Sequence, residues 1–88
     1  MNWRIKIESN AVKALQKLDK VTRQRIERFI DRLVGEENTR SRGIALQGEA
    51  YDGLWRYRVG DYRLICQIKD KEVLILVVEI GHRKAIYR

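Results

Sequence analysis

Apolar and polar residues alternate at the start of the chain. Trp3, Ile5 and Ile7 are separated by charged side chains at positions 4, 6 and 8. A period of two is typical of a half-buried β-strand. The pattern therefore predicts a first strand over these residues.

The period then changes to that of an amphipathic helix. Ala11, Ala14, Leu15 and Leu18 fall on one helical stripe, and a Ser or Asn at positions 9–10 can cap the helix, which we expect to run to about Leu18.

A second helix is predicted directly afterwards, with Asp19 as its N-cap and its end at about Val34. Its core-facing residues are Ile26, Phe29, Ile30 and Leu33. The outer face carries Arg23, Gln24, Glu27, Arg28, Asp31 and Arg32. A solvated face is the simplest interpretation, and nucleic-acid binding by that face stays open.

The second half of the chain reads as strands. Residues 35–53 are polar and rich in Gly, and we expect a connecting loop there. Residues 54–66 predict a β-hairpin that turns at Gly60-Asp61. After a turn at Asp70-Lys71, residues 72–80 are apolar on both alternating sets, as in a strand covered on both faces; Gly81 should end it. Residues 82–88 form a charged C-terminal arm.

The order strand, helix, helix and three strands predicts a single α+β domain over residues 1–88. A helical hairpin packs on one face of a small, mainly antiparallel, four-stranded sheet. Large aromatics on these strands usually pack, so we expect Trp3, Trp55, Tyr57 and Tyr62 in or against the core.

The predicted hairpin carries three arginines. Arg56 and Arg58 are two residues apart on one strand and should share a face, and Arg63 stands on the returning strand. Guanidinium groups are bidentate donors to phosphate oxygens, so we expect an anion-binding surface on the sheet face away from the helices. The alternative is an exposed sheet edge protected from aggregation by its charges.

The charge balance agrees with an anionic partner. The 88 residues hold 19 Lys and Arg against 12 Asp and Glu, a net charge of +7. The excess is spread along the chain rather than held in a basic tail. It favours nucleic acid or an acidic protein segment as partner.

Other chemistry has little support. Cys66 is the single cysteine and lies in an apolar strand, which indicates a buried thiol. One His and one Cys fall short of a zinc site. We expect no metal and no cofactor. A single cysteine cannot form an internal disulfide, so a reducing cytoplasm is the simplest compartment. The N-terminus has no continuous apolar segment, so we expect neither a signal peptide nor a membrane span.

Two motifs carry a resemblance to a known family. The run Trp-Arg-Tyr-Arg-Val-Gly-Asp-Tyr-Arg-Leu-Ile over residues 55–65 and the ending Glu-Ile-Gly-His-Arg-Lys-Ala-Ile-Tyr-Arg over residues 79–88 resemble the RelE/ParE superfamily of toxins from toxin–antitoxin pairs. The similarity covers nearly the whole chain.

The RelE-like branch implies a ribosome-dependent mRNA endonuclease that cleaves by 2′-hydroxyl attack on the adjacent phosphate. The resemblance implies Arg56, Arg58, Arg63, Arg83 and Tyr87 as catalytic residues. Arginines stand where the best-known member has lysines, and a guanidinium is a poor proton carrier. Lys84 and Arg88 join Arg56, Arg58 and Arg63 as expected RNA contacts.

The proton-transfer groups stay open at this stage. A phenol such as Tyr87 is a poor base at neutral pH unless nearby arginines lower its pKa, and it can instead stack on a base. Arg83 suits stabilisation of the leaving oxygen. His82 exchanges protons readily near neutral pH and is a possible catalytic residue, although a structural cap is preferred.

The resemblance also implies partners and alternatives. We expect a cognate, RelB-like antitoxin, the ribosome and mRNA, and operator DNA for the toxin–antitoxin complex. The ParE branch shares the fold but inhibits DNA gyrase. A third alternative is an inactive member that only binds its antitoxin.

Overall fold

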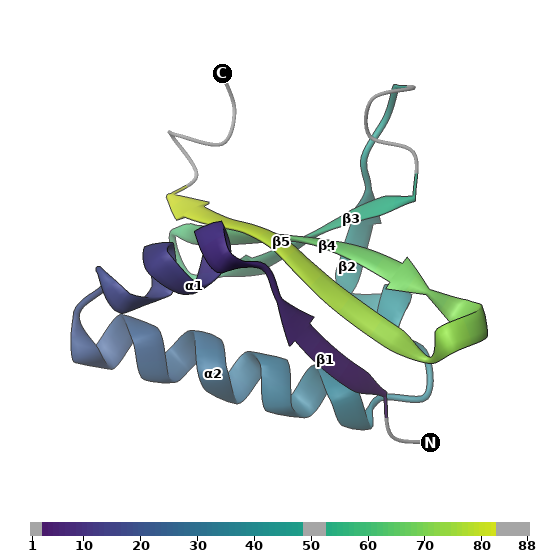
Figure 1. Ribbon diagram of the computed structural model, residues 1–88, viewed down its shortest axis with the longest axis horizontal. Helices are drawn as coiled ribbons and strands as arrows, with labels where there is room; N and C mark the ends of the chain where they lie inside the picture. Colours follow the sequence, from purple (N-terminus) through teal and green to yellow (C-terminus); the bar gives the residue numbers. More distant parts are fainter. Residues whose placement is uncertain (1–2, 49–52, 83–88) are drawn as a thin grey trace.

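The computed structural model describes residues 3–48 and 53–82, which form two helices on one side of a five-stranded sheet (Figure 1). The helices are α1 (Ser9–Gln16) and α2 (Lys20–Gly35). The strands are β1 (Arg4–Ile7), β2 (Gly43–Ala45), β3 (Leu54–Val59), β4 (Tyr62–Lys69) and β5 (Leu74–His82). Short 3₁₀ turns, η1 (Thr39–Arg42) and η3 (Asp70–Glu72), precede β2 and β5.

The strand order across the sheet is β1-β5-β4-β3-β2. β1 pairs with β5 in parallel, and the other three pairings are antiparallel. The predicted α+β class and the mainly antiparallel sheet are therefore confirmed.

The sheet has one strand more than predicted. The extra strand is β2, which lies inside the segment 35–53 that the sequence indicates as loop. It pairs with β3 over three residues, with Gly43 opposite Tyr57. A Cβ at Gly43 would stand 2.8 Å from Tyr57 Cε1, so glycine lets the two backbones pair above this ring.

The helices begin differently. Asp19 caps α2 as predicted, accepting a hydrogen bond from the Thr22 backbone N–H at 3.1 Å. The predicted cap of α1 is wrong: its N-cap is Glu8, without a side-chain hydrogen bond. Asn10 instead donates from Nδ2 to the Val78 carbonyl at 2.9 Å, which joins α1 to β5.

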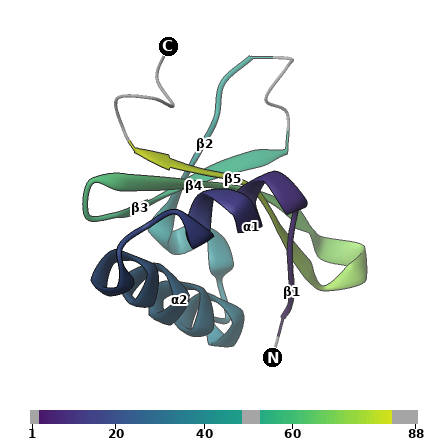
Figure 2. The same ribbon diagram turned by 60° about the vertical axis from the view of Figure 1, so that its left-hand side comes forward.

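Both helices cover one face of the sheet (Figure 2). The core residues come from these helices and from the strands they cover. The predicted stripe of α2 is buried, as are Ala11 and Leu15 of α1. Tyr57 is fully buried, and Trp3, Trp55 and Tyr62 pack against the core, which confirms their expected role. In the described part of the chain, no helix is long and apolar enough to cross a membrane.

Both predicted turns form. Gly60, at the tip of the β3–β4 hairpin, has a φ of 60°, a conformation that glycine adopts without strain. The predicted turn at Asp70-Lys71 is η3, and Val73 after it has a φ of 50°. Gly81 does not end the last strand, because β5 continues through His82.

Candidate functional site

The three hairpin arginines share the sheet face that points away from the helices. Tyr57 and Leu64 lie opposite each other on β3 and β4, and both belong to the core. Because side chains alternate along a strand, the neighbouring Arg56, Arg58 and Arg63 project to the other side. We call these three residues the arginine face, and the predicted common face is confirmed.

Two of these arginines lie directly opposite each other. Arg58 of β3 pairs in register with Arg63 of β4. Like charges directly opposite each other are unfavourable in a sheet, and an anion bound between them would reduce this repulsion. Arg63 is 8% exposed, and its Nη1 donates to the Tyr62 carbonyl at 3.4 Å.

Arg58 reaches beyond the arginine face. Its Nε donates to the Gly60 carbonyl at 3.3 Å, which draws the guanidinium toward the hairpin turn. There it lines a groove of about 680 Å³ between α2 and the turn, which we call the α2 groove. Arg56 and Arg63 do not line this groove. We expected all three cations to converge. They share one face of the sheet, but they do not share one pocket.

One carboxylate on this face was not singled out from the sequence. Arg56, Ile65 and Glu79 form one row across β3, β4 and β5, so Glu79 projects to the same side as the arginines. It is exposed. Glu79 was difficult to recognise from the sequence, because the rest of its strand is apolar at both alternating sets of positions.

His82 lies in register with Tyr62. The two rings meet edge to face, with centroids 5.4 Å apart and planes at 84°. Alternation along β4 places Tyr62 on the opposite face from Arg63. His82 thus pairs with the helix-side row, as a packing residue does.

The remaining predicted site residues are Arg83, Lys84, Tyr87 and Arg88. They lie outside the described residues, and their roles stay predictions. Across residues 3–48 and 53–82, no group of three His, Cys, Asp or Glu side chains is arranged to hold a metal ion.

The buried polar side chains next to the site have structural roles. Burial raises the pKa of the Cys66 thiol to about 12, so the thiol stays protonated and is a poor nucleophile. Burial also raises the pKa of Tyr57, whose hydroxyl donates to the Thr39 carbonyl at 2.7 Å.

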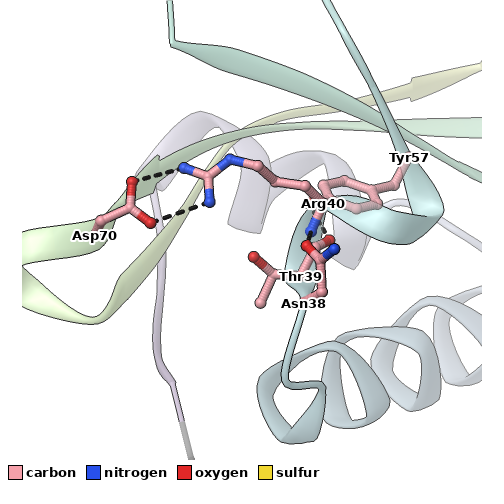
Figure 3. Close-up of polar contacts among 5 residues, drawn as sticks. All are labelled: Asn38, Thr39, Arg40, Tyr57 and Asp70. Atoms are coloured by element: carbon pink, nitrogen blue, oxygen red, sulfur yellow. Dashed lines mark hydrogen bonds and ion pairs between the residues drawn. The ribbon is translucent and has the colours of Figure 1, made fainter.

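A polar clasp around Arg40 joins three segments (Figure 3). Nη1 and Nη2 of Arg40 donate to both carboxylate oxygens of Asp70 at 3.0 and 2.6 Å, and the guanidinium lies 5.6 Å from the Trp55 ring centroid. The clasp ties η1 to η3 and β3. Tyr57 and Thr39 add a second link from β3 to η1, so the arginine-bearing strand is held near both ends of its pairing with β2.

A five-stranded sheet that is backed by a helical pair on one face and carries three arginines on the other defines a small α+β protein with a basic sheet face. Residues 5–87 match the family described as the ParE toxin of the type II toxin–antitoxin system parDE. The chain is also 26% identical, over 84 residues, to a RelE-like toxin protein of Escherichia coli, covering 96% of this chain and 86% of that protein.

Solved structures show the same relationship. The archaeal RelE–RelB complex from Pyrococcus horikoshii OT3 contains a chain 36% identical to this one, with a TM-score of 0.77 and coverage of 94% of this chain and 97% of that chain. A mutant of E. coli toxin RelE in the free state shares the fold at 20% identity, with a TM-score of 0.74 and coverage of 97% and 87%. The chain belongs to the RelE/ParE superfamily and is a toxin of a type II toxin–antitoxin system.

Proposed function

We propose that this toxin arrests translation by cutting messenger RNA on the ribosome, with the ribose 2′-hydroxyl attacking the adjacent phosphate. The observation that carries the proposal is the opposed pair Arg58–Arg63, beside Arg56, on one face of the sheet. The similarity of this chain to RelE also supports the proposal. It is seen both in the sequence motifs and in the comparison with the Pyrococcus structure. Such a target would place the protein in the cytoplasm.

The reaction sets three chemical requirements. A base removes the 2′-hydroxyl proton, the 2′-oxygen bonds to phosphorus, and the bond to the 5′-oxygen breaks as that oxygen takes up a proton. The products are a 2′,3′-cyclic phosphate and a 5′-hydroxyl. The nucleophile belongs to the RNA itself, so the step as written consumes no water and calls for no cofactor.

Each requirement has candidate residues. The arginine face suits the negative charge that builds on the non-bridging oxygens. By resemblance, Tyr87 would accept the proton and Arg83 would stabilise the leaving oxygen. Glu79 is an alternative proton acceptor, because it projects from the same face as Arg56.

The ribosome would complete the site. A phenol and a guanidinium are weak acid–base groups at neutral pH, and positioning of the RNA by the ribosome can supply much of the missing rate.

The test uses programmed ribosomes. We expect the purified toxin to cut the bound message, and the Arg56→Gln/Arg58→Gln variant to cut at least about 100-fold more slowly, since several stabilising donors are lost. The matched control is Arg23→Gln/Lys13→Gln, which removes the same charge from the helices. Equal cutting by both variants would remove the arginine face from the mechanism.

An antitoxin is the proposed protein partner. The solved relatives include complexes of RelE with RelB. On the arginine-bearing face of this sheet, Leu54, Leu74 and Leu76 are half-buried and Ile44 is 58% exposed. An amphipathic antitoxin segment could cover these apolar residues while its acidic side chains neutralise Arg56 and Arg58. Removing those acidic residues should restore toxicity to the complex. Binding of operator DNA would belong to this complex.

Inhibition of DNA gyrase is the second candidate. It is favoured by the match of residues 5–87 to the ParE family. Block of supercoiling by the purified protein, with ribosome-bound messages left intact, would establish this function in place of RNA cleavage. A protein that leaves growth unaffected when expressed without its antitoxin would instead be an inactive, antitoxin-binding member.

A further inference from the structure

The α2 groove holds charge that the arginine face does not account for. It is lined by Arg25, Arg28, Asp31 and Arg32 of α2 and by Arg58 and Gly60 of the hairpin, with Phe29 and Val59 as its apolar part. Four arginines and one aspartate give it a net charge of +3 (4 − 1).

The helical spacing explains how these arginines gather. Arg25, Arg28 and Arg32 are separated by three and four residues, so they form one row along α2. Arg25 extends across to the turn: its Nη1 lies 3.6 Å from the point where a Cβ at Gly60 would stand. The row therefore faces the hairpin, where the guanidinium of Arg58 closes the groove.

No ion pair within the described residues neutralises these charges. In the described residues, the ion pairs join Arg40 to Asp70, Arg42 to Glu36 and Lys69 to Glu72, all outside the groove. Asp31 lies among the arginines without an ion pair in that same part of the chain. Four guanidinium groups around one groove repel each other, and an anion in the groove would relieve this repulsion.

We propose that the α2 groove binds the phosphodiester backbone of RNA next to the segment held on the arginine face. Arg58 connects the two surfaces, because it is in register with Arg63 yet lines the groove. A strand leaving the arginine face would pass over the hairpin turn and place its next phosphates against α2. The inference rests on the proposed function, which supplies the RNA.

The composition of the groove favours phosphates over a protein segment. An amphipathic helix docks by burying apolar side chains in an apolar groove. Here Phe29 is only 8% exposed, and four of the eight lining residues are arginines. A volume of about 680 Å³ lies within the range that holds small ligands, about 300–1,000 Å³, and suits a sugar–phosphate unit.

The test is the binding of a labelled 2′-O-methyl RNA, which cannot react by 2′-hydroxyl attack, to the free toxin at several salt concentrations. The groove variant is Arg25→Gln/Arg28→Gln/Arg32→Gln. The matched control, Lys13→Gln/Lys20→Gln/Arg23→Gln, also removes three positive charges from the helices but none from the groove. Circular dichroism checks that both variants are folded.

We expect the groove variant to bind at least about 10-fold more weakly at 0.1 M salt. Its slope of log K against log salt should fall by about 2, because each lost phosphate contact on a single strand contributes about 0.7. The control should stay within about 2-fold of the wild type. Asp31→Asn should tighten binding by a few fold, since it removes a repelling carboxylate.

Three results would overturn the proposal. The first is RNA binding by the groove variant that equals that of the wild type. The second is equal weakening of RNA binding by both triple variants, which leaves only a general charge effect. The third is a loss of affinity by the groove variant for the antitoxin alone, which makes the groove a protein-binding surface. Absence of cleavage together with groove-dependent RNA binding would reject the nuclease function and leave the groove assignment intact.

Discussion

At the level of single residues, burial determines which side chains of this toxin are reactive and which are structural. Cys66 has 0% exposure and lies in the core on β4, the strand that also carries Arg63. Its raised pKa follows from desolvation by burial, which disfavours the charged thiolate.

We therefore predict that Cys66 resists alkylation in the folded toxin. Iodoacetamide at pH 8 should label the native protein at least about 100-fold more slowly than the same protein in denaturant, since the thiolate is the reacting form. Mass spectrometry of the intact chain measures the labelled fraction. Rapid labelling without denaturant would mean that this part of the core opens readily.

The polar clasp predicts a dependence of stability on acid. Hydrogen bonds from Arg40 lower the pKa of Asp70 below its ordinary value of 3.8. Because the folded-state pKa is the lower one, the clasp stabilises the fold above about pH 4, and this contribution is lost as the pH falls through the folded-state value. Asp70→Asn should melt at a lower temperature than the wild type at pH 7. The difference between the two melting temperatures should be smaller at pH 2.

Melting curves measured between pH 2 and 7 test this. Asp61→Asn, at the exposed hairpin turn, is the matched control and should follow the wild type. A constant difference between Asp70→Asn and the wild type over this range would contradict the assigned role.

Elements differ in how far their sequences determine them. The two helices were predicted because apolar residues recur every three or four positions and Asp19 supplies a cap. The hairpin was predicted because β-branched and aromatic residues flank Gly60. In these elements, local sequence and tertiary contacts favour the same structure.

β2 was missed for a physical reason. It is three residues long and its central residue, Ile44, is 58% exposed, so no alternation marks it. Its strand conformation comes from pairing with β3. The arginine face could be predicted from alternation along one hairpin. The α2 groove could not, because it depends on how α2 packs against that hairpin, and no local sequence pattern specifies this packing.

Two glycines should respond in opposite directions. Gly43→Ala should destabilise the protein by about 1–3 kcal/mol, since the new Cβ would collide with the buried Tyr57 ring. Gly35→Ala should stabilise it by about 0.5–1 kcal/mol, because Gly35 ends α2 with nothing within 4 Å of the added carbon. Urea denaturation gives both values. A neutral Gly43→Ala would mean that β2 can shift away from β3 at little cost.

At the scale of the whole molecule, six arginines make up two connected surfaces, the arginine face and the α2 groove. With a net charge of +7, anions that bind these surfaces should stabilise the folded state by mass action. We predict that 10 mM phosphate raises the melting temperature more than sodium chloride of equal ionic strength does. The advantage of phosphate should shrink in the groove variant. An equal effect of both salts would indicate screening without site binding.

The parallel pairing of β1 with β5 has a consequence for how the toxin is made. Arg4 lies opposite Leu74 and Ile7 opposite Val77, so the first strand to leave the ribosome completes the sheet only against the last one. Contacts so distant in sequence form late. During its own synthesis the chain therefore cannot close the sheet while β5 is still in the exit tunnel, and the nascent toxin stays incompletely folded until β5 has left the ribosome.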